Sequence, residues 1–225
     1  MLLSLIRGAN LIELIAYVFS MAFVVFCTLP VHEYAHALVA TKMGDNTAKN
    51  HGRLTLNPMA HIDWIGALMI LLVGFGYAKP VPVIARNFKN PKWGMALTAL
   101  AGPMSNIIMA FVFLIGLNAV SHFCDLNVTL WFAVYYFLYF AASVNISLAV
   151  FNLLPVPPLD GSRVLNAVLP AKYYFAIMKY ERYIVIGIFI LLFTGILSTP
   201  LSYLSNLLFR ALNYVAALPF GGLLK

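Results

Sequence analysis

Long apolar runs separated by short polar stretches dominate the chain. The first run begins after Asn10, a residue that can cap a helix, and continues to a stop at Gly44. A helix of this length, about 50 Å, exceeds the roughly 30 Å hydrocarbon thickness of a bilayer. We therefore expect a membrane helix that tilts, kinks at Pro30 or protrudes.

Four further runs are long enough to be helices, at about 94–121, 129–154, 183–198 and 200–218. The run at 62–78 is shorter and punctuated by glycine, so it is either a full span or a re-entrant or partial segment. The pattern predicts an all-α polytopic membrane protein. With residues 62–78 re-entrant, it has about five full transmembrane helices.

The polar linkers carry turn and strand signals. Residues 53–56, Arg-Leu-Thr-Leu, fit a short strand before Asn57 and Pro58. The alternating PVPV of residues 80–83 predicts a short β-hairpin or exposed edge strand near 80–84.

Composition agrees with a membrane protein. Of the 225 residues, 63% are hydrophobic and only 9% are charged, whereas a soluble domain has roughly 25% charged residues. The start shows no small-residue cleavage site, so we expect the first apolar run to remain as a membrane helix. No linker is long enough for an inserted domain of about 50 residues, which favours one domain over 1–225.

An ionisable cluster interrupts the first apolar run. Residues 32–36 read His-Glu-Tyr-Ala-His, an HExxH motif. On a helix, His32 and His36 lie on the same face, where two imidazoles can bind one metal ion. Glu33 lies on the adjacent flank, where a hydrolytic general base is needed. A lone histidine is more often a core residue, but this group is costly in hydrocarbon and therefore predicts a metal site.

Asp160 is the strongest candidate for a third ligand, which a catalytic zinc site usually requires. It closes the run FNLLPVPPLDG, whose prolines end the preceding helix and force extended backbone. A proline-rich loop with a solvated Asp160 is the alternative. The other acidic residues lie at helix ends or in linkers, where solvation is the ordinary explanation: Glu13, Asp45, Asp63, Asp125 and Glu181.

HEYAH together with FNLLPVPPLDG resembles the paired signature of the site-2 protease family of intramembrane zinc metalloproteases. The stretches GRLTLNPMAHIDWIG, GYAKPVPV and AGPMSN resemble its short bacterial members, so the resemblance covers roughly residues 20–165. It implies a Zn²⁺ cofactor and a catalytic core at about 10–165, followed by C-terminal helices at 166–225. The implied site residues are His32, His36 and Asp160 as ligands, Glu33 as general base and Asn152 as a group binding the substrate backbone or the oxyanion.

Two further polar residues, His61 and Asn57, lie in a family-like loop. Either a secondary role at the site or a structural, capping role fits them. In AGPMSN, the small residue Gly102 and its neighbours Ser105 and Asn106 are better explained by close packing of membrane helices than by chemistry.

Topology links the two signatures. Asp160 can bind the same ion as the histidines only if the 129–154 helix ends at the membrane face where the first helix ends. This requires two crossings between them, which favours the re-entrant interpretation of 62–78. Under it, one face holds only Asp125 in the linker 122–128, and the other carries Lys42, Lys49, Arg53, Lys79, Arg86, Lys89, Lys92, Arg163, Lys172, Lys179 and Arg182.

The net charge of +7 therefore reflects topology and anionic lipid rather than nucleic acid. By the positive-inside rule the basic face is cytoplasmic. We expect an integral protein of a bacterial cytoplasmic membrane, in contact with the lipid bilayer, with its site toward the cytoplasm. The oligomeric state is left open.

The predicted function is that of a zinc-dependent intramembrane endopeptidase, which hydrolyses peptide bonds within or near transmembrane segments of membrane-anchored proteins. A helical substrate must unwind first, and the predicted edge strand near 80–83 is suited to hold it extended. The alternatives are a divalent-metal transporter, which would tolerate Gln in place of Glu33, and an inactive protease-like scaffold.

Overall fold

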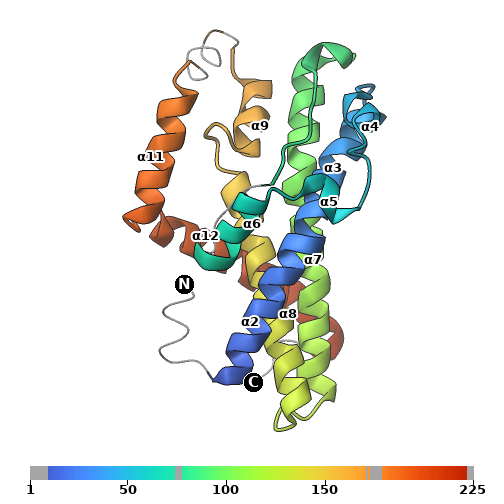
Figure 1. Ribbon diagram of the computed structural model, residues 1–225. Coiled ribbons are helices and arrows are strands. Elements are labelled where there is room, and N and C mark those ends of the chain that lie inside the picture. The colour runs from blue at the N-terminus through green and yellow to red at the C-terminus, as the bar shows by residue number, and fades with distance from the viewer. Residues whose placement is uncertain (1–9, 74–77, 171, 173–178, 222–225) are drawn as a thin grey trace.

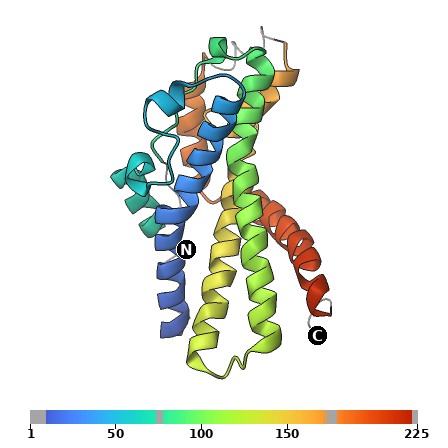
Figure 2. The ribbon, with the colours of Figure 1, turned by 90° about the vertical axis from the view of Figure 1, so that its right-hand side faces the viewer.

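The computed structural model describes residues 10–73, 78–170, 172 and 179–221. These residues form helices joined by irregular linkers (Figure 1). Three helical stretches are long and apolar enough to cross a membrane: Leu11–Lys42, Pro91–Phe123 and Thr129–Asn152. They run side by side (Figure 2), and together they form the frame on which the site is built.

The first span consists of α2 (Leu11–Phe23), a π-helical turn η1 (Val24–Thr28) and α3 (Leu29–Lys42). Its predicted cap is present, since the Asn10 side chain accepts a hydrogen bond from the backbone N–H of Ile12. Pro30 has no N–H and interrupts the normal ladder. The wider π turn lies directly before it, with the N–H of Leu29 bonded to the carbonyl of Val24, so the helix continues through the proline.

The span ends at Gly44, whose φ of 111° is left-handed and suits glycine. The N–H of Gly44 bonds to the carbonyl of Thr41 and that of Asp45 to the carbonyl of Ala40, which together form a Schellman motif. Asp45 is thereby fixed to the end of the helix that carries HExxH.

The other two spans, α7 (Pro91–Phe123) and α8 (Thr129–Asn152), pack tightly against each other. Helix α3 lies on α7, and α2 lies on α8. Buried alanines such as Ala110 and Ala142 let the backbones approach. Polar contacts add to the packing: Ser20 Oγ donates to the carbonyl of Phe137 at 3.0 Å.

The linker after α3 contains α4 (Thr47–Asn50), α5 (Pro58–His61) and α6 (Trp64–Val73). The backbone N–H of Lys79 bonds to the carbonyl of His61 at 2.8 Å, so the chain returns at residue 79 to the point it left at residue 61. The described residues at the two ends of this linker therefore lie side by side, as expected if it is re-entrant. Residues 74–77 lie outside the described part.

The strand predictions are wrong for the described residues. Residues 53–56 and 80–84 form no strand, because no neighbouring segment pairs with their backbones. Residues 81–84 nevertheless carry no helix or turn, and Ile84 is extended, with φ −115° and ψ 108°. The 3₁₀ turn η2 (Ala85–Asn87) follows and leads into α7.

Five full spans are likewise not confirmed. After α8 come α9 (Asp160–Val168), α11 (Glu181–Phe193), α12 (Ser198–Ala217) and the 3₁₀ turn η3 (Leu218–Phe220). Helix α11 has 13 residues, about 20 Å, which is too short to cross hydrocarbon unaided. Helix α12 has 20 residues but interrupts its apolar face with polar side chains, and Asn118 on α7 donates to Asn213 on it at 2.8 Å.

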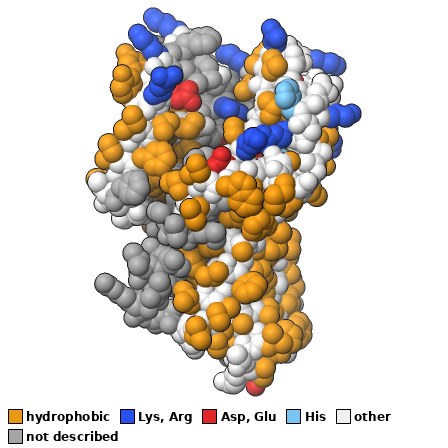
Figure 3. Space-filling model, in the orientation of Figure 1, with side chains coloured by type: hydrophobic (Ala, Val, Ile, Leu, Met, Phe, Trp, Pro, Cys, Tyr) orange, Lys and Arg blue, Asp and Glu red, His pale blue; other side chains and the backbone are white. Residues whose placement is uncertain are grey.

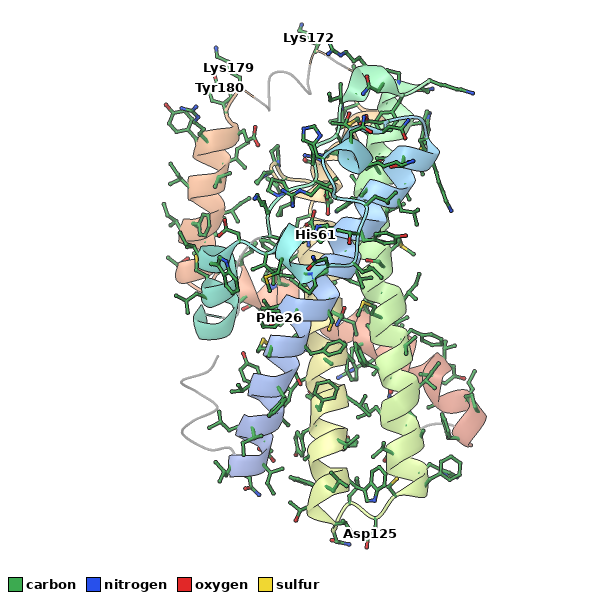
Figure 4. All side chains as sticks on the ribbon, turned by 45° about the vertical axis from the view of Figure 1, so that its right-hand side comes forward. Phe26, His61, Asp125, Lys172, Lys179 and Tyr180 are labelled. Carbon is green, nitrogen blue, oxygen red and sulfur yellow. The ribbon has the colours of Figure 1, made fainter. Side chains whose placement is uncertain are left out.

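Charge is distributed unevenly along the molecule. Lys and Arg side chains gather at the upper end in Figure 3, and the middle of this face is mainly hydrophobic. Lys172 and Lys179 lie at that end, whereas Asp125 lies at the other, in the turn between α7 and α8 (Figure 4).

Candidate metal centre

A cavity of about 480 Å³ lies where α3, the end of α8, α9 and the segment before η2 meet. We call it the site cavity. Helix α11 contributes Val185, Ile188 and Phe189 to its wall. The polar side chains that line it are His32, Glu33, His36, Asn152, Asp160 and Arg163.

Three potential metal-binding side chains converge in the site cavity. The Nε2 atoms of His32 and His36 are 3.0 Å apart, and each lies 3.4 Å from Oδ2 of Asp160. A tetrahedral zinc ion with ligands at 2.0–2.1 Å holds its ligand atoms about 3.3 Å apart. The three residues therefore have the chemistry and the spacing of a zinc site, and they are the one such group among the described residues.

The backbone of α7 shapes this group. The carbonyl of Thr98 accepts a hydrogen bond from Nδ1–H of His36 at 2.7 Å, which leaves Nε2 as the free lone pair. Such a bond orients a ligating imidazole and fixes its tautomer. One turn further, Gly102 faces both imidazoles, and a Cβ at this position would overlap the Nε2 atoms of His32 and His36. Helix α7 therefore leaves a space beside the ligands that any larger residue would fill.

Asp160 reaches the histidines because α8 ends at Asn152 and the chain turns sharply before α9. Gly161 lies against the backbone carbonyls of Leu153 and Leu154, where a Cβ would not fit. Oδ2 of Asp160 thereby comes within 3.4 Å of Nε2 of both His32 and His36. Its carboxylate can therefore bind the same ion as the two imidazoles.

Glu33 and Asn152 share the cavity with the three potential ligands. Glu33 is buried, and it follows His32 on α3, as a base beside the metal requires. The side-chain amide of Asn152 has no hydrogen-bond partner within the described part of the chain, so it can bind a ligand in the cavity.

His61 and Asn57 do not line the site cavity. His61 on α5 is fully buried, and its Nε2 bonds to the carbonyl of Thr55 at 2.8 Å (Figure 4). Asn57 caps α5 by accepting a hydrogen bond from the N–H of Met59. Both residues order the linker between α3 and α6.

Sequence reasoning missed three features of this site. Arg163 was assigned only to the basic face, although its spacing of three from Asp160 places both on one side of a helix. The other two features are the close approach of Gly102 to the imidazoles and the hydrogen bond from His36 to the carbonyl of Thr98, and both depend on how α3 packs on α7. The sequence indicates neither feature, except that residue 102 is a glycine.

Comparisons with known proteins agree with this geometry. The model of peptidase family M50 matches residues 127–194, which include Asn152, Asp160 and Arg163. The protein YwhC of Bacillus subtilis (strain 168) is 41% identical over 185 residues, 81% of this chain and 81% of its own length.

Two further relatives are more distant. The protein Rip2 of Mycolicibacterium smegmatis is 28% identical, covering 76% of this chain and 65% of its own length. A protein of Methanocaldococcus jannaschii is 32% identical, covering 66% of this chain and 34% of its own length. The names of all three relatives contain the words zinc metalloprotease, which only the third of them carries without a qualifier. No solved structure matches the chain significantly.

Proposed function

Because the chain belongs to peptidase family M50, the site-2 protease family, we propose that it is a zinc-dependent intramembrane endopeptidase. The observation that carries the proposal is the convergence of His32, His36 and Asp160 beside Glu33, with the two histidines and Glu33 on a helical stretch apolar enough to span a membrane. Its substrates are membrane-anchored proteins, cut within or near a transmembrane helix.

His32, His36 and Asp160 would hold the ion. When bound, Zn²⁺ supplies Lewis-acid polarisation of the scissile carbonyl and acidifies water at neutral pH. Glu33 takes the proton of the attacking water and passes it to the leaving amine. The amide of Asn152, which lines the same cavity as the ligands, binds the substrate backbone or the developing oxyanion.

A helical substrate offers no free backbone, so it must unwind before it reaches the ligands. Pro80 and Val81 line the site cavity, residues 80–84 carry no helix or turn, and Ile84 at their end is extended. These residues, here called the extended segment, are suited to bind the unwound substrate as an added strand. Replacing residues 80–83 by four alanines should abolish cleavage and leave zinc bound, whereas unchanged cleavage would refute this role. Alanines at 125–128, in the turn at the opposite end, provide the control.

The charge distribution supports an orientation with the basic end in the cytoplasm of a bacterial cell. In this proposed orientation the site, which α3 and α9 carry, lies in the half of the membrane nearer the cytoplasm. The protein is then an integral component of the cytoplasmic membrane.

The test is co-expression with a panel of tagged single-span helices, comparing wild type with Glu33→Gln. Wild type should release fragments cut within the span, and Glu33→Gln should reduce them by a factor of about 100 or more, because no base remains. Zinc content is measured on both purified proteins. Equal cleavage by both would contradict the proposed role of Glu33, and metal flux without cleavage would favour a transporter.

A further inference from the structure

Asp45 is a fully buried carboxylate in a linker where solvation was expected. Its Oδ1 accepts hydrogen bonds from the backbone N–H of Thr47 at 3.0 Å, from the Thr47 hydroxyl and from Nδ2 of Asn87 at 2.8 Å. Its Oδ2 accepts the backbone N–H of Ile84 at 2.7 Å. The two oxygens thus have different partners, and within the described residues Oδ2 accepts only the N–H of Ile84, in the extended segment.

Asp45 itself cannot move freely relative to the metal ligands. The Schellman motif fixes its backbone to the last turn of α3, because its N–H bonds to the carbonyl of Ala40 at 2.9 Å. The same helix carries His32 and His36. A rigid element therefore connects the metal ligands to the carboxylate.

The extended segment is held at both ends. Lys79 before it donates to the carbonyl of His61, and Ile84 at its end donates to Asp45. Between these points, Val81 belongs to a buried apolar cluster with Ala37, the residue after His36, and it also lines the site cavity. The segment is therefore positioned against the turn of the helix that holds the metal ligands.

The backbone between the anchors offers few donors. Pro80 and Pro82 have no N–H, whereas the N–H and C=O groups of Val81 and Val83 form no hydrogen bond within the described residues. Between the anchors, only Val81 and Val83 therefore offer both a donor and an acceptor to an extended peptide beside this segment. Their valine side chains face Ala37, Ala48 and Leu54, which leaves the backbone edge as the part that a peptide can use.

We propose that Asp45 is a positioning residue for the substrate, which acts by holding the N–H of Ile84 so that Val81 and Val83 present their backbones to an unwound substrate. The inference rests on the proposed function. Asp45 contacts neither the metal ligands nor the substrate in this scheme, and its effect is transmitted through Ile84.

Asp45→Asn tests the proposal with little change of shape. In the variant, Thr47 and Asn87 can still donate to the amide oxygen of Asn at position 45. The amide NH₂ then points toward the N–H of Ile84, and two donors that face each other repel. Asp125→Asn is the matched control, because Asp125 also accepts from nearby backbone but lies at the opposite end. The probe is a tagged single-span helix that the wild-type protein cleaves in detergent micelles.

Three readouts are measured on each purified variant: zinc per chain, amide hydrogen exchange of the peptide containing Ile84, and the separate values of kcat and KM. We expect unchanged zinc content, exchange at Ile84 about tenfold faster, and KM raised about fivefold or more with kcat within about twofold. Asp125→Asn should match wild type throughout.

Faster exchange at Ile84 with an unchanged KM would overturn the proposal, since the segment would then be free without consequence for the substrate. Unchanged exchange would also overturn it. A wild-type protein that binds zinc and cleaves no helix of the panel would instead refute the proposed function, and the exchange measurement would still report on the bond between Asp45 and Ile84.

Discussion

Gly102 determines how much room the metal ligands have. It lies one turn after Thr98 on α7, and its missing side chain leaves the space in which the two imidazoles meet. The sequence suggested only a packing role for this residue. Packing and chemistry coincide here, because the helix that approaches closely is the one that orients His36.

Gly102→Ala should therefore weaken zinc binding by a factor of about 100 or more, since the added methyl would overlap the Nε2 atoms of both histidines. Zinc content after dialysis against a graded series of chelators measures this. Gly116→Ala is the control on the same helix, because its Cβ would meet Leu138 only at an ordinary 3.5 Å. Equal zinc affinity in both variants would contradict the steric role of Gly102.

Asp45 allows a prediction about pH. Burial would raise its pKa, but hydrogen bonds from Thr47, Asn87 and Ile84 outweigh burial and lower it. As pH falls, the unfolded chain takes up this proton first, near its usual pKa of about 3.9. The stability that the carboxylate contributes is therefore complete above about pH 5 and is lost as pH falls through the native pKa.

Asp45→Asn should accordingly lower the free energy of unfolding by about 1–3 kcal/mol, equally at pH 8 and pH 5.5. Below about pH 4, the difference in unfolding free energy between wild type and variant should become smaller. Denaturant unfolding of the metal-free proteins in micelles checks this, because chelation removes the separate effect of zinc release. A gap that changes between pH 5.5 and 8 would show that another group titrates with Asp45.

At the scale of elements, the apolar periodicity predicted the three long helices well. Their limits follow from local chemistry, such as the cap at Asn10 and the left-handed Gly44. The β prediction failed because a strand needs a partner, which alternating PVPV in one sequence cannot supply. The predicted spans after residue 180 were overestimated, since an apolar run does not reveal that α11 ends at Phe193.

Helix α9 illustrates how one element depends on another. Asp160 is its first residue, and Gly161 lies against the carbonyls of Leu153 and Leu154. Gly161→Ala should displace the start of α9 and move the carboxylate away from the histidines, reducing zinc affinity by about tenfold or more. Gly187→Ala in α11, where no atom lies within 4 Å of the added Cβ, should bind zinc like wild type. Titration of the metal-free proteins with zinc distinguishes the two.

At the scale of the whole molecule, the paired motifs predicted which residues converge, because HExxH and LDG occur together with a re-entrant linker between them. The hydrogen bond from Lys79 to His61 shows how that linker closes. The site cavity itself could not be predicted, since its walls come from α3, α8, α9, α11 and the extended segment at once.

The proposed orientation predicts how the natural cysteines react. Cys124 lies at the end of α7 next to Asp125, on the side assigned to the cell exterior, whereas Cys27 lies within the first span. A membrane-impermeant maleimide should label Cys124 in intact cells and should not label Cys27. Cys124→Ser should abolish the labelling, and Lys89→Cys in that background should react only after the cells are opened. Labelling of Lys89→Cys in intact cells would reverse the orientation.

The apolar cluster that Val81 shares with Ala37 has a consequence for where a substrate is cut. Ala37 follows His36, so in the proposed function the segment that binds the substrate packs on the same helix, α3, that carries the two histidine ligands. The distance between the bound stretch of the substrate and the metal ligands is then constant. In the proposed function, the cut falls a constant number of residues from the unwound stretch, and moving that stretch along a substrate moves the cut by the same number of residues.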